Sequence, residues 1–157
     1  MSWPAGIEGP LVVTALAFVP ELESRAAIPI ALLAYHMSVP AALGWTLLGN
    51  LAGGAASWWV LPAVARQGRR IGWIGRLLDR IQRHTLKRAL GTRQALERTG
   101  LLLFVGVPLP GTGVWAGAAI AKLLNVSGRR AFWPLLGGTV MAAVLVTILV
   151  ETGRLVL

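Results

Sequence analysis

Two carboxylates and one guanidinium interrupt an apolar stretch near the start of the sequence. Glu21, Glu23 and Arg25 alternate between apolar segments at residues 11–19 and 28–35. Arg25 can pair with Glu21 if the stretch is helical, because residues i and i+4 adjoin. It can also do so if the stretch is extended, because alternate residues share a face. A guanidinium of this kind can hold an anion, and the carboxylates can exchange a proton.

The two flanking segments are each too short to cross a bilayer. At about 1.5 Å per helical residue, each covers roughly half of a hydrocarbon core about 30 Å thick. They therefore predict a re-entrant hairpin, a shape tolerated where protein or a water-filled cavity covers the irregular backbone. An isolated charge at the midplane costs about 2.5 to 3.5 kcal/mol on insertion scales, so the charges are expected to pair and to mark a pathway. The alternative is a surface loop between two loosely packed helices.

The composition is that of an integral membrane protein. Of 157 residues, 55% are hydrophobic and 13% are charged, and the mean hydropathy is +0.68. Soluble domains carry about 25% charged residues. With no cysteine and two distant histidines, His36 and His84, disulfide, thiolate and zinc chemistry are not expected. The sequence also lacks a P-loop pattern, so we expect neither an enzyme nor a metal or cofactor.

The net charge of +9 is concentrated in one connector. Residues 66–100 hold ten Lys or Arg against Asp79 and Glu97, a balance of +8 that leaves +1 for the rest of the chain. Apolar residues at helical spacing oppose a stripe of Arg side chains there. This pattern predicts an amphipathic helix on the membrane surface, with Trp73 as an anchor. Beside membrane spans, such a stripe favours lipid headgroups over nucleic acid.

A second break follows the connector. The run Pro108-Leu109-Pro110-Gly111-Thr112-Gly113 cannot continue a helix, and a helix resumes at Val114 with Thr112 as a candidate N-cap. A plain loop is the alternative. Trp115, just after the break, either lines a path or packs. Asn50, the one amide of the apolar stretch 40–61, is either an interhelical hydrogen bond or a ligand.

The order of elements repeats. Shifting the second half back by 88 residues superposes Trp133 on Trp45 and the Leu-Leu-Gly run at 135–137 on the run at 47–49. Each half contains a short apolar segment, a Pro-containing break, another short segment and a full span, about 40–61 or 131–150. We predict an all-α integral membrane protein: an inverted repeat of two re-entrant helical hairpins, each followed by a transmembrane helix, plus a cytoplasmic amphipathic helix.

The predicted organisation is a single membrane domain over residues 1–157. Repeat 1 covers about 10–65, the connector about 66–100 and repeat 2 about 101–152. The positive-inside rule places the connector in the cytoplasm and both termini outside, in a plasma membrane. Four or five membrane elements enclose little volume, so a homodimer is plausible.

Three stretches resemble the small multidrug export family: Glu23-Ser24-Arg25-Ala26-Ala27-Ile28-Pro29, Gly49-Asn50, and the second break through Val114-Trp115-Ala116-Gly117. Ser24 and Ala26 replace a Leu-like residue and a Gly in the family's pattern. The family is similar to the DedA, or SNARE-associated, membrane proteins, which include lipid-carrier translocases and scramblases. The resemblance implies paired re-entrant hairpins and transport of a lipophilic or lipid-linked substrate.

We therefore expect a small transporter that moves such an anion, with helix starts near Ile28 and Val114 presenting N–H groups to it. Arg25 would hold the anion, and Glu21 or Glu23 would couple transport to a proton gradient. The alternatives are an exporter of lipophilic cations and a structural protein in which these charges form a buried lock. The expected partners are membrane lipids and the substrate, without nucleic acid. The candidate substrate- or ion-binding residues are Glu21, Glu23, Arg25, Pro29, Asn50, Pro108, Pro110, Gly111, Thr112, Gly113 and Trp115.

Overall fold

The computed structural model describes residues 7–68, 93–109, 112–123 and 126–156. All secondary-structure elements in these ranges are helical, so the predicted all-α class is confirmed for them. In chain order they are α1 (Glu8–Phe18), α2 (Glu23–Pro29), the π-helix η1 (Ile30–Ala34), α3 (Val39–Gly68), α5 (Arg93–Gly106), α6 (Val114–Leu123) and α7 (Gly128–Val156).

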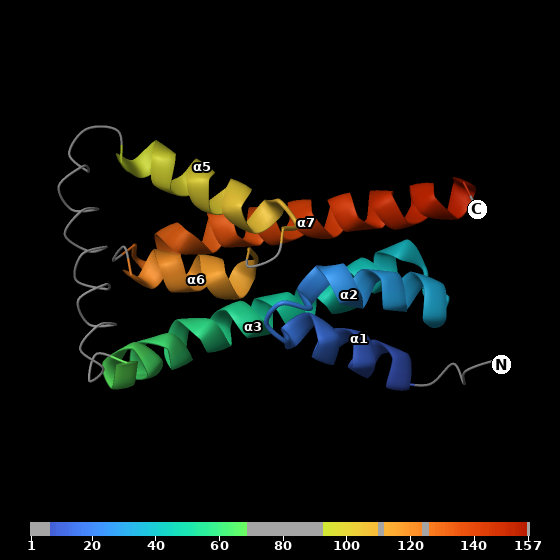
Figure 1. Ribbon diagram of the computed structural model, residues 1–157, viewed down its shortest axis with the longest axis horizontal. Coiled ribbons are helices and arrows are strands. Elements are labelled where there is room, and N and C mark those ends of the chain that lie inside the picture. The colour runs from blue at the N-terminus through green and yellow to red at the C-terminus, as the bar shows by residue number, and fades with distance from the viewer. Residues whose placement is uncertain (1–6, 69–92, 110–111, 124–125, 157) are drawn as a thin grey trace.

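The helices form two hairpins and two long helices. α1 turns into α2, and α5 turns into α6 (Figure 1). α1 packs along α3 as α5 packs along α7, and each short helix, α2 or α6, also contacts the long helix of the other half. The turns of the two hairpins meet in the middle of the molecule (Figure 1).

The two halves correspond in sequence position and run in opposite directions. An offset of 88 residues carries α3 onto α7 to within one residue at each end, and the two long helices are antiparallel (Figure 1). The same offset relates buried or partly buried residues of the two cores: Val13 and Leu101, Ala17 and Val105, Leu47 and Leu135. Whether the hairpins are re-entrant, and whether the halves are inverted across a bilayer, stay predictions.

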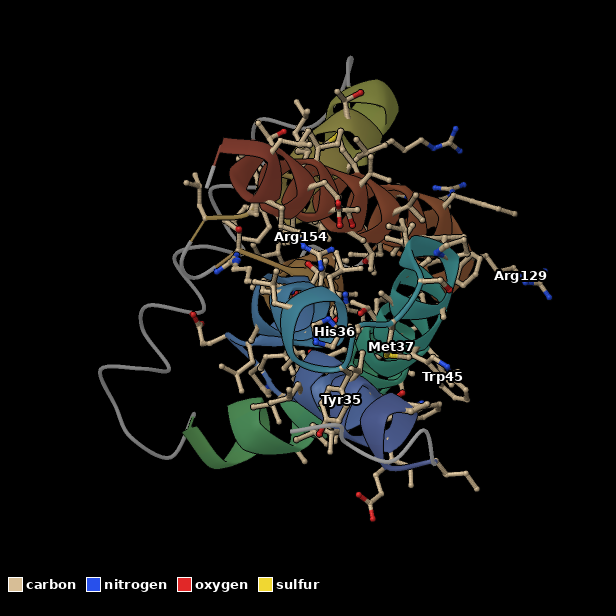
Figure 2. All side chains as sticks on the ribbon, turned by 90° about the vertical axis from the view of Figure 1, so that its right-hand side faces the viewer. Tyr35, His36, Met37, Trp45, Arg129 and Arg154 are labelled. Atoms are coloured by element: carbon tan, nitrogen blue, oxygen red, sulfur yellow. The ribbon has the colours of Figure 1, made fainter. Side chains whose placement is uncertain are left out.

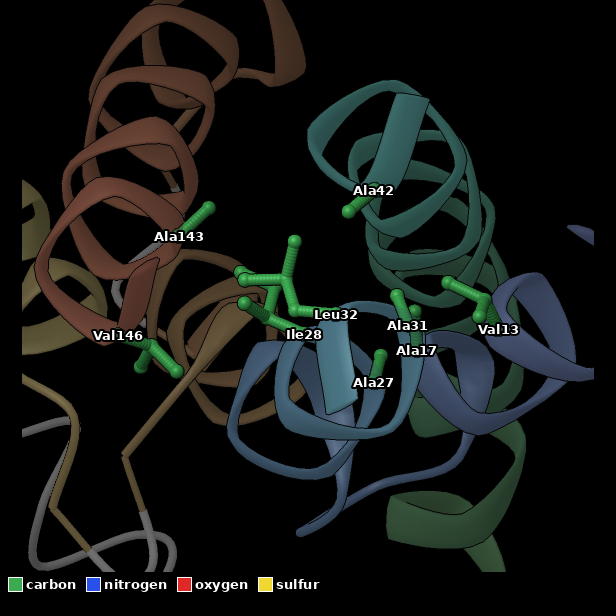
Figure 3. Close-up of a cluster of buried hydrophobic side chains, with 9 residues drawn as sticks. All are labelled: Val13, Ala17, Ala27, Ile28, Ala31, Leu32, Ala42, Ala143 and Val146. Carbon is green, nitrogen blue, oxygen red and sulfur yellow. The ribbon is translucent and has the colours of Figure 1, made fainter. Parts of the chain in front are cut away.

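The first core lies between the long helices. Ile28 and Leu32, from α2 and η1, are fully buried and reach toward Ala42 of α3 on one side and Ala143 and Val146 of α7 on the other (Figure 3). Small residues on both long helices let this hairpin approach closely, which is how helices associate in membranes. The first hairpin thereby joins α3 to α7.

The predicted helix start near Ile28 is wrong, because α2 begins at Glu23. Pro29 lies inside the helix with φ −55° and ψ −44°. A proline ring favours this φ but removes one i to i−4 hydrogen bond. The chain continues as a π-helix, in which the Tyr35 N–H donates to the Ile30 carbonyl at 3.1 Å. Such π-bulges absorb a local irregularity without ending a helix.

Several predicted boundaries also shift. α3 runs on to Gly68 and α5 begins at Arg93, so both ends of the predicted connector belong to neighbouring helices. Its central part, including Trp73, lies outside the described residues. α7 extends beyond the predicted 131–150 at both ends. Helices end where the backbone conformation changes, and hydropathy alone does not locate that point.

The far end of the first hairpin carries the link from η1 to α3, with Tyr35, His36 and Met37 (Figure 2). The Tyr35 ring packs where Gly9 of α1 lacks a side chain: a Cβ there would lie 2.9 Å from Tyr35 Cδ1. His36 is exposed, with φ +50°.

One of the described helices, α7, is long and apolar enough to cross a membrane, over Gly128–Leu155, and an 18-residue window within it has a mean hydropathy of 2.1. α3 is of similar length but is not among the candidate spans found within the described residues, so the span predicted at 40–61 stays a prediction. Large apolar side chains nonetheless cover the outside of the bundle. They include Leu48 and Trp59 of α3 and Ile148 and Leu149 of α7. An extended exposed apolar surface is typical of a site of membrane or protein contact.

Candidate functional site

The carboxylate of Glu23 lies at the N-terminus of α6, a helix of the other hairpin. The Val114 N–H donates to Oε2 at 3.2 Å, and the Trp115 N–H donates to Oε1 at 3.4 Å. The Glu23 residue is 7% exposed. A carboxylate here satisfies N–H groups that have no partner within the helix and lies at the positive end of the helix dipole. Glu23 therefore caps a helix that begins 91 residues later.

Gly113, the residue before α6, makes this contact possible. Its φ is +137°, a conformation that residues with a Cβ rarely adopt. A Cβ at Gly113 would also overlap the Glu23 carboxylate. Glycine is required here for backbone conformation and for space.

Arg25 binds the turn of the second hairpin. Its Nη2 donates to the Thr112 carbonyl at 2.8 Å and to Thr112 Oγ1 at 2.9 Å. The same hydroxyl lies 2.7 Å from the carbonyl oxygens of Val107 and Leu109. It donates to one of them at a time. Thr112 thus holds the turn together. The prediction that Thr112 is the N-cap of α6 is wrong, because the Glu23 carboxylate accepts the hydrogen bonds from the first N–H groups of that helix.

Trp115 is partly exposed and contacts both α1 and α3. Its Nε1 donates to the Phe18 carbonyl at 2.8 Å, and the two rings meet edge to face at 5.7 Å. Its own carbonyl accepts a hydrogen bond from Ser57 Oγ at 2.9 Å. Gly53 of α3 leaves room for the indole, since a Cβ there would lie 2.5 Å from Nε1.

Asn50 is buried in α3 together with Thr46, one turn away. They are 1% and 0% exposed. Asn50 Oδ1 and Thr46 Oγ1 have no hydrogen-bond partner among the described residues, so the interhelical bond considered for Asn50 is not seen at this oxygen. Leaving a buried polar atom unpaired costs about 1–3 kcal/mol.

The turn of the first hairpin is strained. Glu21 and Glu23 have φ +72° and +38°, in the left-handed region that non-glycine residues seldom occupy. Such strain costs about 1–3 kcal/mol per residue and concentrates at functional sites. Here it directs the Glu23 side chain into α6, while Glu21 is exposed.

The structure thus brings together four of the predicted residues: Glu23, Arg25, Thr112 and Gly113, with Trp115 beside them. Pro29 lies in α2 and Pro108 in the turn after α5, both partly exposed. Pro110 and Gly111 lie outside the described residues.

Sequence reasoning missed Thr46 and Ser57. With Asn50 they form a polar series at intervals of four and seven residues along α3. That spacing places all three on one helix face, a signal that was available in an otherwise apolar helix.

The apolar span, the exposed apolar surface and the all-helical fold agree with a helical membrane protein. Residues 23–145 match the family described as "Putative small multi-drug export protein". Because the match covers most of the chain, the protein belongs to this family, whose name describes a membrane exporter. The matched region begins at Glu23, directly after the first hairpin turn, and includes the second turn. Comparisons with curated proteins and with solved structures found no match.

Proposed function

We propose that the protein transports a lipophilic or lipid-linked anion across the membrane together with a proton that Glu23 takes up. The observation that carries the proposal is the buried Glu23 carboxylate on the N-terminus of α6, beside Arg25. No chemical step is involved, and no enzymatic activity, metal or cofactor is proposed.

The lengths of the hairpin helices support a midplane position for this site. α1 has 11 residues and α6 has 10, which correspond to about 15 Å at about 1.5 Å per residue. This is half of a hydrocarbon core of about 30 Å. Re-entrant hairpins entering from opposite faces would meet at the middle, as the turns meet here. The opposite directions of α3 and α7 fit an inverted repeat in a plasma membrane, with the connector cytoplasmic and both termini outside.

The helix terminus provides the coupling. The N–H groups of Val114 and Trp115 can bind one anionic group at a time, so a substrate anion must displace the Glu23 carboxylate. A displaced carboxylate in an apolar setting is costly unless it takes up a proton. Binding of the anion and protonation of Glu23 therefore occur together. The strained backbone at Glu21 and Glu23 lowers the cost of that release.

Arg25 supplies the positive charge that remains when Glu23 is neutral. Its hydrogen bonds to Thr112 fix the guanidinium beside the start of α6. A guanidinium offers a planar fork of donors that matches a phosphate or carboxylate, whereas a lysine ammonium acts as a point charge. Arg25 and the N–H groups of α6 together form the proposed anion site.

Transport in liposomes with an imposed pH gradient tests the proposal. A fluorescent phospholipid, a polyprenyl phosphate and a lipophilic cation are compared for wild type, Glu23→Gln and Arg25→Lys. The control is Glu151→Gln, whose carboxylate pairs with Arg154 at the surface. We expect wild type and Glu151→Gln to transport the anion at the same rate. Glu23→Gln should transport it independently of the pH gradient, and Arg25→Lys should transport it at least tenfold more slowly. Anion transport by Glu23→Gln with unchanged pH dependence would refute the coupling.

An exporter of lipophilic cations is the second candidate, favoured by the family name and by aromatic residues near α6. Lys122 Nζ lies 4.6 Å from the centroid of the Trp58 ring, so this ring already accepts a cation through its π-face. Transport of the cation alone in the same assay would support this alternative. We also propose a relationship to the DedA proteins and assembly as a homodimer.

A buried lock without transport is the remaining alternative. The combination of Arg25→Ala, Glu21→Gln and Glu23→Gln separates it from the anion site. A triple variant that is stable but inactive supports the anion site, whereas a fully active one rejects it.

A further inference from the structure

An apolar groove of about 280 Å³ lies between α3, α6 and α7. Ala55, Trp58 and Trp59 of α3 line one wall, Phe132 and Leu136 of α7 line the other, and Val114 of α6 closes the inner end. None of the lining residues carries a charge or a hydroxyl group. The groove therefore suits a hydrocarbon chain and offers little to a polar ligand.

The corresponding place in the first half is filled. There Ile28 and Leu32 occupy the space between α3 and α7 (Figure 3). The offset of 88 residues places Ala116 and Ile120 at the matching positions of α6. Alanine has three side-chain carbons fewer than isoleucine, but the residue of α6 that lines the groove is Val114. The groove is thus a specific difference between two otherwise corresponding interfaces.

The outer end of the groove is basic. Gly128 lines this end and is followed by Arg129 and Arg130, both exposed. Arg129 extends outward from α7 (Figure 2). Lys122, also exposed, lies over the ring of Trp58, a wall residue. Three cations thus lie next to residues that line an uncharged groove: Lys122 over Trp58, and Arg129 and Arg130 between Gly128 and Ala131.

We propose that this groove binds an anionic membrane lipid, with one acyl chain against the aromatic wall and the phosphate group on Lys122, Arg129 and Arg130. Basic residues beside a pocket between membrane helices bind anionic headgroups in this way. A second copy of the chain packed in parallel against this groove would bring its own basic residues to the same end, so this groove is disfavoured as the interface of a dimer. The proposal does not depend on transport, because it concerns a bound lipid at the edge of the bundle.

Photoactivatable lipids test the site in the full-length protein. Phosphatidylglycerol and phosphatidylcholine, each with a photoreactive acyl chain, are cross-linked in nanodiscs, and mass spectrometry locates the labelled peptides. Ala55→Phe fills the groove from an exposed position, and the combined Lys122→Gln, Arg129→Gln and Arg130→Gln variant removes the charges. Ile148→Phe, at an exposed position that does not line the groove, is the matched control.

We expect phosphatidylglycerol to label residues of the groove at least fivefold more than phosphatidylcholine does. Ala55→Phe should abolish this labelling, the charge variant should remove the preference for phosphatidylglycerol, and Ile148→Phe should change neither. Unchanged labelling in Ala55→Phe would overturn the groove as the site. Equal labelling by both lipids in wild type would overturn the headgroup assignment. Cross-links from the groove to a second chain in place of lipid would overturn the occupant.

Discussion

The two hairpin turns have corresponding positions but opposite chemistry. The first turn carries charged side chains, and the second supplies backbone groups: N–H donors to Glu23 and a carbonyl acceptor to Arg25. The offset of 88 residues places Gly111 at the position of Glu23 and Gly113 at that of Arg25. Gly113 leaves the backbone before α6 accessible to the Glu23 carboxylate. A repeat can therefore keep one fold in both halves while dividing a binding contact between them.

The interfaces of the two halves differ in packing, and Ile28→Ala gives the largest expected effect. This change opens a cavity in the filled interface and should lower the free energy of unfolding by about 2–5 kcal/mol. Leu51→Ala, in the wall of the open groove, should cost less than about 1 kcal/mol because Leu51 is already 36% exposed. Denaturation in mild detergent measures both. Equal losses would show that the two interfaces are packed alike.

Gly113→Ala tests the backbone side of the contact. The added Cβ meets the Glu23 carboxylate and requires a disfavoured φ, so we expect a loss of about 1–3 kcal/mol from strain. Gly100→Ala is the control, since nothing lies within 4 Å of its Cβ position in α5. A thermal shift assay compares them. A Gly113→Ala protein as stable as Gly100→Ala would contradict the described geometry.

Arg25→Ala tests the charged side. It removes two hydrogen bonds to Thr112. A hydrogen bond from a charged group contributes about 1.5–3 kcal/mol, so the free energy of unfolding should clearly fall. Arg25→Lys keeps the charge and should recover part of that stability, but not transport. Unfolding and liposome transport are measured on the same preparations. Full transport by the lysine variant would show that charge alone is needed.

Ser57→Ala gives the smallest expected effect. It removes one hydrogen bond to the Trp115 carbonyl and should cost about 0.5–1.5 kcal/mol. Thr152→Ala, an exposed hydroxyl deletion on α7, should be close to neutral. Parallel melting curves distinguish the two. Identical curves would indicate that α3 does not support the start of α6 through this bond.

The sequence predicted the order of the described helices and singled out the residues that meet in the central contact, but not the contact itself. Charges between two short apolar segments located Glu23 and Arg25, and a proline- and glycine-rich run located Thr112 and Gly113. Periodicity could not predict that Glu23 caps α6, because that contact joins residues 91 positions apart. The propensity of Thr for N-cap positions pointed to Thr112, and a tertiary contact overrode it.

The boundaries near Pro29 and the groove show a second limit. Proline ends many helices, but here a π-helix accommodates it, which depends on packing around Ile28 and Leu32. The groove lies in one half, whereas Ile28 and Leu32 fill the matching positions of the other half. The sequence alone could not predict the groove, because the residues that surround it in space are known only from the structure.

Cysteine cross-linking between the two turns tests the central claim most directly, because the chain has no native cysteine. Arg25→Cys with Thr112→Cys is treated in native membranes with bifunctional thiol reagents of increasing length, and Arg25→Cys with Arg98→Cys is the control. We predict cross-linking within one chain by short reagents for the first pair and not for the second. A folded protein in which residues 25 and 112 fail to cross-link at any length, or do so only between chains, would contradict the joined turns.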